Sequence, residues 1–207
     1  MSKVVIEVHS REWFPNSEGS VISASIPTNM FTELNENVMK LEAIDPALIV
    51  AGGCLRDWVF GKEINDIDIF MNSHYNPAWW FEMQLRQAGF IITSKKSGEN
   101  IPQDYKLNPD IRAVYEVKPA VAYNCLLKYQ IICMKADSTT FGIVEKFPID
   151  ICQLWWKPNH PNIHCTKSFA KAVESGVSLN LNPVYANGHF YLEKVKEKYK
   201  GLFEFKF

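Results

Sequence analysis

The sequence has no long apolar run, and this absence excludes a membrane-spanning helix. The longest runs, such as Leu48–Ala51 and Ile131–Met134, fall far short of the roughly 20 residues that a bilayer requires. The N-terminal segment MSKVVIEVHSREW carries charges where a secretion signal has an apolar stretch. We therefore expect a cytoplasmic protein that does not bind membranes.

An excess of charge of either sign is also absent. The 207 residues contain 22 Lys and Arg against 23 Asp and Glu, which gives a formal net charge of -1. A chain that binds nucleic acid through its overall charge is strongly basic. Any contact with RNA must therefore rest on a local patch.

The five cysteines include no CxxC pair. Their odd number and mostly apolar surroundings fit reduced, buried thiols better than a disulfide framework. Competent zinc ligands do occur close together in the sequence, at Cys152, His160, His164 and Cys165. Because His164 and Cys165 are adjacent and prolines interrupt the loop, we favour ordinary loop histidines over a zinc site.

Helical and extended patterns alternate along the chain, without an internal repeat or a linker between domains. Apolar residues at helical spacing predict helices over 30–43, 54–60, 77–88, 166–175 and 191–200. Short apolar runs predict strands over 4–8, 48–51, 64–71, 90–93, 111–117, 123–134 and 149–155, with a polar loop over 94–109. We therefore expect one domain over residues 1–207, of α/β (α+β) class, with a single mixed sheet and flanking helices.

The segment from Ile49 to Phe70 is the most informative part of the sequence. Gly52-Gly53 separates a strand from a helix, and glycines at a helix start let a phosphate approach the backbone N–H groups. Asp66 and Asp68 are two apart in a strand, so they project from the same face. Paired carboxylates repel unless a cation lies between them, and Mg²⁺ binds one or two carboxylates together with substrate phosphates. The alternative is two exposed acids at the end of a strand.

The order Gly52-Gly53-x-x-Arg56-Asp57-x-x-x-Gly61 followed by Asp66-x-Asp68 resembles the GG-x-x-RD-x-x-x-G…DxD motif of CCA-adding enzymes and bacterial poly(A) polymerases. These enzymes belong to the polymerase β-type nucleotidyltransferase superfamily. The match covers about 48–71. The resemblance implies a nucleotidyltransferase fold, with a catalytic core over about 30–156 and a C-terminal helical extension over about 166–207. CCA-adding enzymes carry further regions that select the base and grip tRNA, whereas only a short stretch follows Asp150 here. Their specificity for CTP, ATP or tRNA is therefore not carried over.

The resemblance also implies roles for individual residues. Asp66, Asp68 and a third acid, Asp150 in the predicted strand 149–155, would be catalytic and would bind two Mg²⁺ ions, with Mn²⁺ able to substitute. Gly52, Gly53, Arg56, Asp57 and Lys62 would contact the nucleotide or its phosphates. For Arg56 and Asp57 a purely structural salt bridge is an equal alternative, and for Lys62 a solvated loop lysine is favoured.

The function that the resemblance implies is an enzyme that transfers a nucleoside monophosphate from an NTP, such as ATP, to an acceptor hydroxyl and releases pyrophosphate. The acceptor would be an RNA 3′ end (tRNA included), a protein or a small molecule, as in a compact phage-encoded modifier. The alternative is a catalytically silent module that binds nucleotide or RNA. A two-metal phosphodiesterase would need further ligands that the motif lacks. The base, the acceptor and the oligomeric state are left open.

Overall fold

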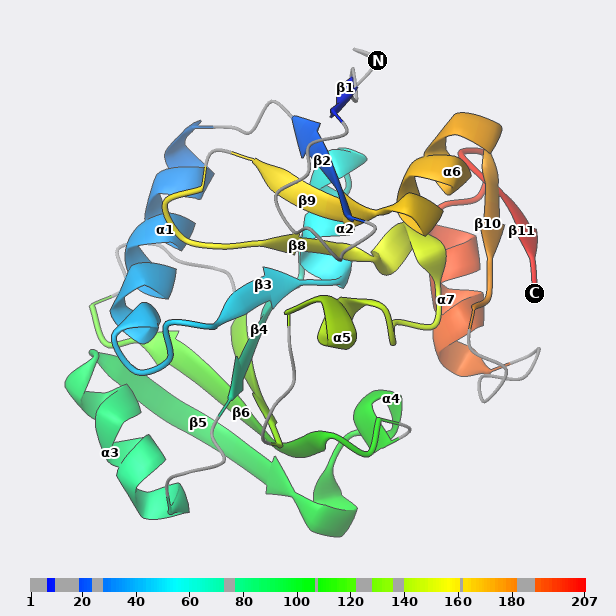
Figure 1. The fold of residues 1–207 in the computed structure, drawn as a ribbon. Coiled ribbons are helices and arrows are strands. Elements are labelled where there is room, and N and C mark those ends of the chain that lie inside the picture. The colour runs from blue at the N-terminus through cyan, green and yellow to red at the C-terminus, as the bar shows by residue number, and fades with distance from the viewer. Residues whose placement is uncertain are drawn as a thin grey trace.

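The computed structural model describes residues 7–9, 19–23, 28–72, 77–106, 108–121, 128–135, 140–160, 162–181 and 189–207. At its centre is a nine-stranded sheet in the order β1-β2-β9-β8-β3-β4-β7-β6-β5 (Figure 1). Its strands are β1 (Glu7–His9), β2 (Gly19–Ser23), β3 (Ile49–Ala51), β4 (Asp66–Asn72), β5 (Phe90–Ser97), β6 (Ile111–Pro119), β7 (Lys128–Met134), β8 (Leu154–Trp156) and β9 (Ile163–Thr166). The β4–β7 pair is parallel and its other pairs are antiparallel. The predicted mixed sheet is therefore confirmed, with a small parallel pair, β10 (Val177–Leu179) and β11 (Glu204–Lys206), beside it.

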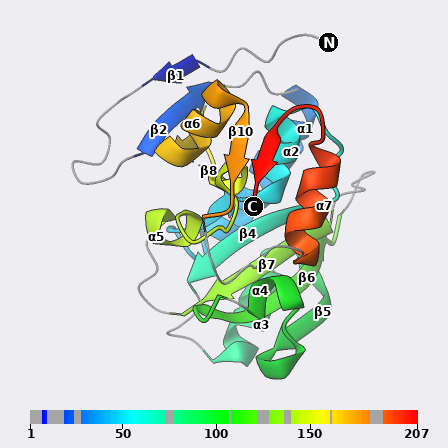
Figure 2. The same ribbon diagram turned by 90° about the vertical axis from the view of Figure 1, so that its right-hand side faces the viewer.

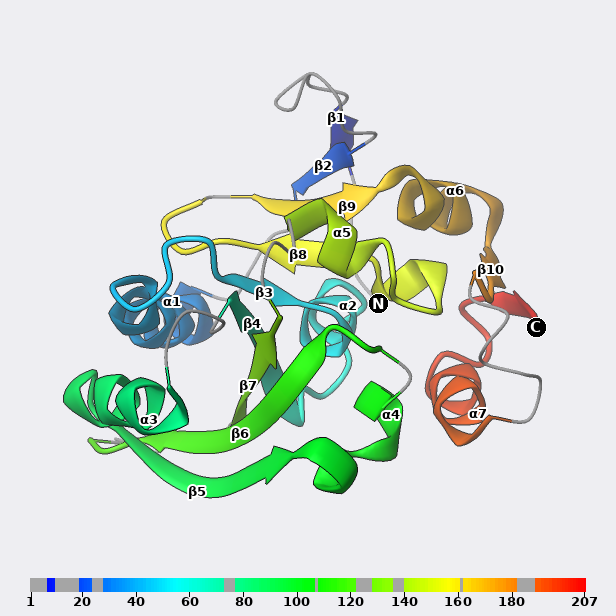
Figure 3. The same ribbon diagram turned by 60° about the horizontal axis from the view of Figure 1, so that its bottom comes forward.

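Helices flank the sheet at both ends. They are α1 (Thr28–Glu42), α2 (Gly53–Val59), α3 (Ala78–Gln87), α4 (Gln103–Lys106), α5 (Thr140–Val144), α6 (Lys167–Ser175) and α7 (Phe190–Lys198), with short 3-10 turns η1 (Gly98–Asn100) and η2 (Asp150–Cys152). Figures 1 and 3 show α1 and α3 at one end, and α6, α7 and the β10–β11 pair at the other. None of the helices in the described ranges is long and apolar enough to cross a membrane.

Alternation along β4 divides the core into two clusters. Ile67, Ile69 and Met71 pack into the cluster that also contains the buried faces of α1, α2, α3, α6 and α7. Phe70 points the other way, into the cluster that contains Ile132 and the buried side of α5. Because side chains alternate along a strand, Asp66 and Asp68 share the face of Phe70.

Most predicted elements are present, and the differences are informative. The predicted loop over 94–109 is wrong, since it contains the end of β5 and helix α4. The predicted strand over 149–155 is also wrong at its start, because residues 150–152 form η2 and β8 begins only at Leu154. Residues 4–6 and 123–127 of two predicted strands lie outside the described residues.

Candidate active site

A cavity of about 330 Å³ opens beside the face of β4 that carries Asp66 and Asp68. Its other walls come from the Gly52–Gly53 turn, Tyr105 of α4, the segment after α5, and one side of α7. Figure 2 shows these elements around β4, with α7 on one side and α5 on the other. The structure thus brings the two predicted aspartates and the glycine turn together at one cavity.

The two aspartates are held by neutral donors. The Tyr105 hydroxyl donates to Asp68 Oδ1 at 3.1 Å, and Gln130 Nε2 donates to Asp66 Oδ2 at 3.1 Å. Burial and the nearby charge of Asp66 raise the pKa of Asp68 to about 7. Neither Asp66 Oδ1 nor Asp68 Oδ2 makes a hydrogen bond to any residue in the described part of the chain. One oxygen of each carboxylate is therefore free to face the cavity.

The glycine turn places backbone directly against the aspartates. Gly52 has a φ of 83°, which side chains disfavour, and a Cβ there would lie 3.5 Å from the Phe147 ring and 4.0 Å from Asp68 Oδ2. Gly53 is helical, and a Cβ there would meet Arg56 Nη2 at 3.4 Å. Gly52 is therefore the position where the chain needs glycine for its backbone conformation, whereas a Cβ at Gly53 would make an ordinary contact with the end of the Arg56 side chain.

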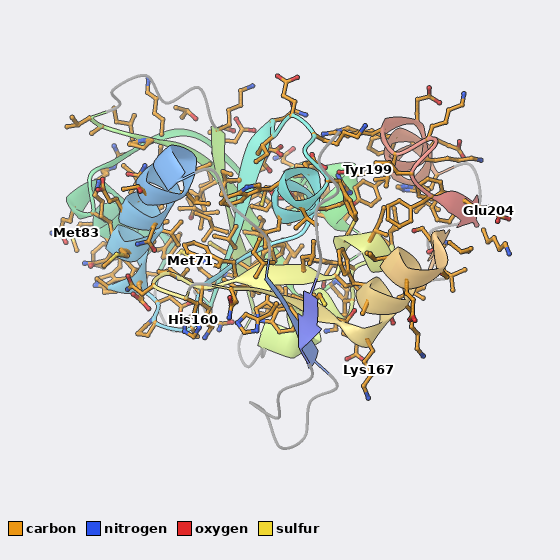
Figure 4. The ribbon with its side chains drawn as sticks, turned by 90° about the horizontal axis from the view of Figure 1, so that it is seen from above. Met71, Met83, His160, Lys167, Tyr199 and Glu204 are labelled. Atoms are coloured by element: carbon orange, nitrogen blue, oxygen red, sulfur yellow. The ribbon has the colours of Figure 1, made fainter. Side chains whose placement is uncertain are left out.

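Arg56 and Asp57 form a buried ion pair that connects α2 to the C-terminal residues. Arg56 Nη2 lies 2.8 Å from Asp57 Oδ1, and Arg56 Nη1 donates to Cys152 Sγ at 2.9 Å. Lys198 and the Tyr199 hydroxyl also donate to the Asp57 carboxylate. Figure 4 shows Tyr199 between α2 and α7. Of the two roles considered for the pair, the geometry favours the structural one, although both residues also line the cavity.

Three lysines also line the cavity. Lys194 and Lys198 lie on the side of α7 that faces it, and Lys146 follows α5. Lys198 is paired with Asp57 and Lys146 with Asp110, whereas Lys194 makes no ion pair or hydrogen bond within the described ranges. Lys62, for which a phosphate contact was the less favoured of two interpretations, does not line the cavity. The sequence showed only a charged terminal helix here, with no sign of which lysines face inward.

Asp150 does not join the other two aspartates. It is 2% exposed and lies in η2, where its carboxylate accepts hydrogen bonds from Ser178 Oγ at 2.6 Å, Leu179 N at 2.9 Å and its neighbour Ile151 N at 2.7 Å. Burial raises the pKa of Asp150, and these hydrogen bonds oppose the rise. Asp150 is not among the residues that line the cavity. Its position as a third acid beside Asp66 and Asp68 is therefore corrected: the carboxylate joins η2 to β10.

This placement predicts that Asp150→Ala affects stability and not chemistry. The substitution leaves the buried Ser178 hydroxyl and the Leu179 N–H without their acceptor, and each unsatisfied group costs about 1–3 kcal/mol. Urea unfolding should show a loss of at least about 2 kcal/mol. The nucleotidyl transfer expected from the sequence should, per folded molecule, stay within about twofold of the wild-type rate, because Asp150 does not line the cavity. Glu174→Gln, at an exposed position on α6, is the control, and a rate loss of orders of magnitude at full folding would return Asp150 to the site.

The cysteines and histidines form no metal site within the described residues. Cys54, Cys133, Cys152 and Cys165 are free and buried, as expected, and Cys125 lies outside the described ranges. His164 stacks on the Trp155 ring, with centroids 5.4 Å apart. The candidate metal ligands in the described residues are therefore the carboxylates of Asp66 and Asp68.

A protein-family model matches most of the chain. Residues 25–176 match the model of the Gabija anti-defense 2 family, Gad2. The protein belongs to this family. No curated protein matches the sequence of this Gad2-family chain.

Solved structures of CCA-adding enzymes resemble this Gad2-family protein in fold. The apo form I of a CCA-adding enzyme superposes with a TM-score of 0.59 at 13% identity, and covers 88% of this chain and 41% of its own. The complex of a CCA-adding enzyme with ATP gives 0.58 at 14% identity, with coverage of 88% and 41%. The Thermotoga maritima enzyme complexed with tRNA gives 0.55 at 14% identity, with coverage of 88% and 40%. These likenesses establish a nucleotidyltransferase-like α/β fold, and the chain spans about 41% of the length of the first two enzymes.

Proposed function

We propose that this protein is a metal-dependent nucleotidyltransferase that transfers a nucleoside monophosphate from an NTP to an acceptor hydroxyl. The observation that carries the proposal is the pairing of Asp66 and Asp68 on one wall of a cavity that is also lined by lysines. The motif through Gly52-Gly53 and Arg56-Asp57 supports a relationship with the head domain of CCA-adding enzymes and bacterial poly(A) polymerases.

The carboxylate pair fits a divalent cation such as Mg²⁺, with Mn²⁺ as a substitute. Asp66 Oδ1 and Asp68 Oδ2 are hard oxygen donors without hydrogen-bond partners among the described residues. Mg²⁺ is commonly held by one or two carboxylates plus substrate phosphates. When bound, such a cation neutralises phosphate charge and lowers the pKa of a bound hydroxyl.

The remaining residues of the cavity suit the triphosphate. Lys194, together with Lys146 and Lys198, would bind phosphate oxygens. The glycine turn leaves room for a phosphate to approach the backbone closely. In the transfer, the acceptor oxygen forms a bond to the α-phosphorus and the bond to the bridging oxygen of the β-phosphate breaks. Pyrophosphate leaves with that electron pair, and the hydroxyl proton passes to water.

The test uses the full chain with Mg²⁺, each of the four α-labelled NTPs, and a cell lysate. Labelled RNA and labelled protein are then separated. Because the family description names an action against Gabija, the labelled products are compared between lysates with and without Gabija components. A product that is labelled only when these components are present is the first acceptor to identify. A labelled macromolecule together with released pyrophosphate supports the proposal. Binding of NTP without pyrophosphate release in any lysate contradicts it and indicates the silent binding module.

We also infer that residues 1–207 act as one unit. The C-terminal extension is not an independent appendage in this view, because Lys198 and Tyr199 contact Asp57 of α2. The lysines of α7 then belong to the same site as the aspartates of β4. This arrangement makes the extension part of the proposed nucleotide site.

Lys194→Met should raise KM for the NTP about tenfold and leave kcat unchanged, because a phosphate contact made equally in the ground and transition states acts on binding alone. Steady-state kinetics with saturating acceptor measure both constants. Lys196→Met is the matched control: it lies on the same helix, beside Glu193 at 4.0 Å, and does not line the cavity. Equal KM values for the two variants would exclude Lys194 from phosphate binding.

A further inference from the structure

A row of polar side chains crosses β4, β7 and β6 next to the cavity. The strand register places Asp68 opposite Gln130, and Gln130 opposite Glu116. Paired residues in a sheet point to the same face. The row therefore reads carboxylate, amide, carboxylate, and the amide stands between the two acids.

The far acid of this row is unavailable to the site. Glu116 lies two strand spacings from Asp68, about 9 to 10 Å. Its carboxylate is paired with Lys96 at 2.7 Å, and it does not line the cavity. Within the described residues, no group of three or more His, Cys, Asp and Glu side chains gathers around a common point. Asp57 and Glu63 also line the cavity, but Asp57 is paired with Arg56 and Lys198, and neither residue forms a group of three with Asp66 and Asp68. The two neighbouring carboxylates that the cavity offers a cation are therefore those of Asp66 and Asp68.

Gln130 and Tyr105 form a connected bridge between these carboxylates. Gln130 Nε2 donates to Asp66 Oδ2 at 3.1 Å, and the Tyr105 hydroxyl lies 3.1 Å from Asp68 Oδ1 and 3.2 Å from Gln130 Oε1. Gln130 itself does not line the cavity. The bridge occupies one oxygen of each carboxylate and leaves the other oxygen free. Groups that hydrogen-bond to metal ligands fix their orientation, and their loss weakens metal binding.

We propose that Gln130 and Tyr105 are positioning residues, which fix Asp66 and Asp68 as a two-carboxylate site for a single divalent cation. The amide of Gln130 does two things in this arrangement. Its N–H orients Asp66. Because the side chain at position 130 is an uncharged amide, this position does not supply a third carboxylate to the site. The proposal deepens the proposed function and rests on it, since it assigns the cation number and the residues behind the ligands.

The two substitutions of Gln130 should act in opposite directions. Gln130→Met removes the N–H donor and adds no charge, so the affinity for Mn²⁺ should fall about tenfold. Gln130→Glu places a carboxylate at the same point and should bind Mn²⁺ at least as tightly as the wild type, because ligand charge is added. Tyr105→Phe should weaken Mn²⁺ binding as Gln130→Met does. A residue with only a structural role would not produce this opposite response to two substitutions of similar size.

The experiment titrates the full chain with Mn²⁺ alone and counts free and bound ion by electron paramagnetic resonance. Melting temperatures of each metal-free variant confirm folding, and Gln84→Met on α3 is the remote control. One Mn²⁺ per wild-type chain, with weaker binding in Gln130→Met and Tyr105→Phe, supports the proposal. Two ions in the wild type overturn the single-cation site, and unchanged affinity in the folded Gln130→Met and Tyr105→Phe variants overturns the positioning role; in both cases the proposed metal site itself still stands. No binding by the wild type overturns the proposed metal site as well.

Discussion

Asp68→Asn should reduce nucleotide transfer by at least about a thousandfold, which corresponds to roughly 4 kcal/mol of transition-state stabilisation. Asparagine keeps the size of the side chain and its acceptor for the Tyr105 hydroxyl. The substitution removes a charge that would hold the cation against the triphosphate. Pyrophosphate release, measured with saturating NTP and acceptor, reports the loss.

The same variant should not be destabilised in the absence of metal. Asp66 and Asp68 are like charges in a partly buried site, and removal of one relieves their repulsion. The melting temperature of the metal-free variant should therefore equal or exceed that of the wild type. Glu116→Gln is the matched control, because Glu116 shares the sheet face but is paired with Lys96 outside the cavity. Wild-type transfer by Asp68→Asn, or an equal loss in Glu116→Gln, would remove the carboxylate pair from the chemistry.

The β4 wall of the site was predictable because its geometry is local. Two acids separated by one residue in a strand must share a face, whatever the rest of the fold does. The glycine turn was predictable for the same reason, since it joins β3 to α2 directly. Local pattern therefore gave Asp66, Asp68 and the Gly52–Gly53 turn, and the structure places them together.

The rest of the site depends on partners far away in the sequence. Ile149-Asp150-Ile151 alternates like a strand, but Asp150 is bound by Ser178 and Leu179, 28 and 29 residues further on. The contact of Gln130 with Asp66 spans 64 residues and follows from the parallel register of β4 and β7. A local sequence pattern predicts neither the register between two strands nor a contact between residues far apart in the sequence. The inward-facing lysines of α7 were missed for the same reason, because α7 meets α2 through contacts of Lys198 and Tyr199 with Asp57 that span 141 and 142 residues.

Asp57→Asn should lower the free energy of unfolding by about 3–5 kcal/mol, which is typical for a broken buried ion pair. Asp57 is 5% exposed and accepts from Arg56, Lys198 and the Tyr199 hydroxyl. Asparagine has one acceptor oxygen and no charge, so the buried Arg56 guanidinium loses its counterion. Urea unfolding followed by tryptophan fluorescence measures the change.

A second consequence distinguishes this network from an ordinary packing contact. Because Asp57 holds Lys198 and Tyr199, its loss should release the α7 wall of the cavity before the sheet unfolds. Amide hydrogen exchange in α7 should therefore increase more than exchange in β4 or β7. Glu193→Gln, which removes an exposed ion pair of α7, should change stability by about 1 kcal/mol or less. If Asp57→Asn were no more destabilising than Glu193→Gln, the buried network would not be what joins α7 to the site.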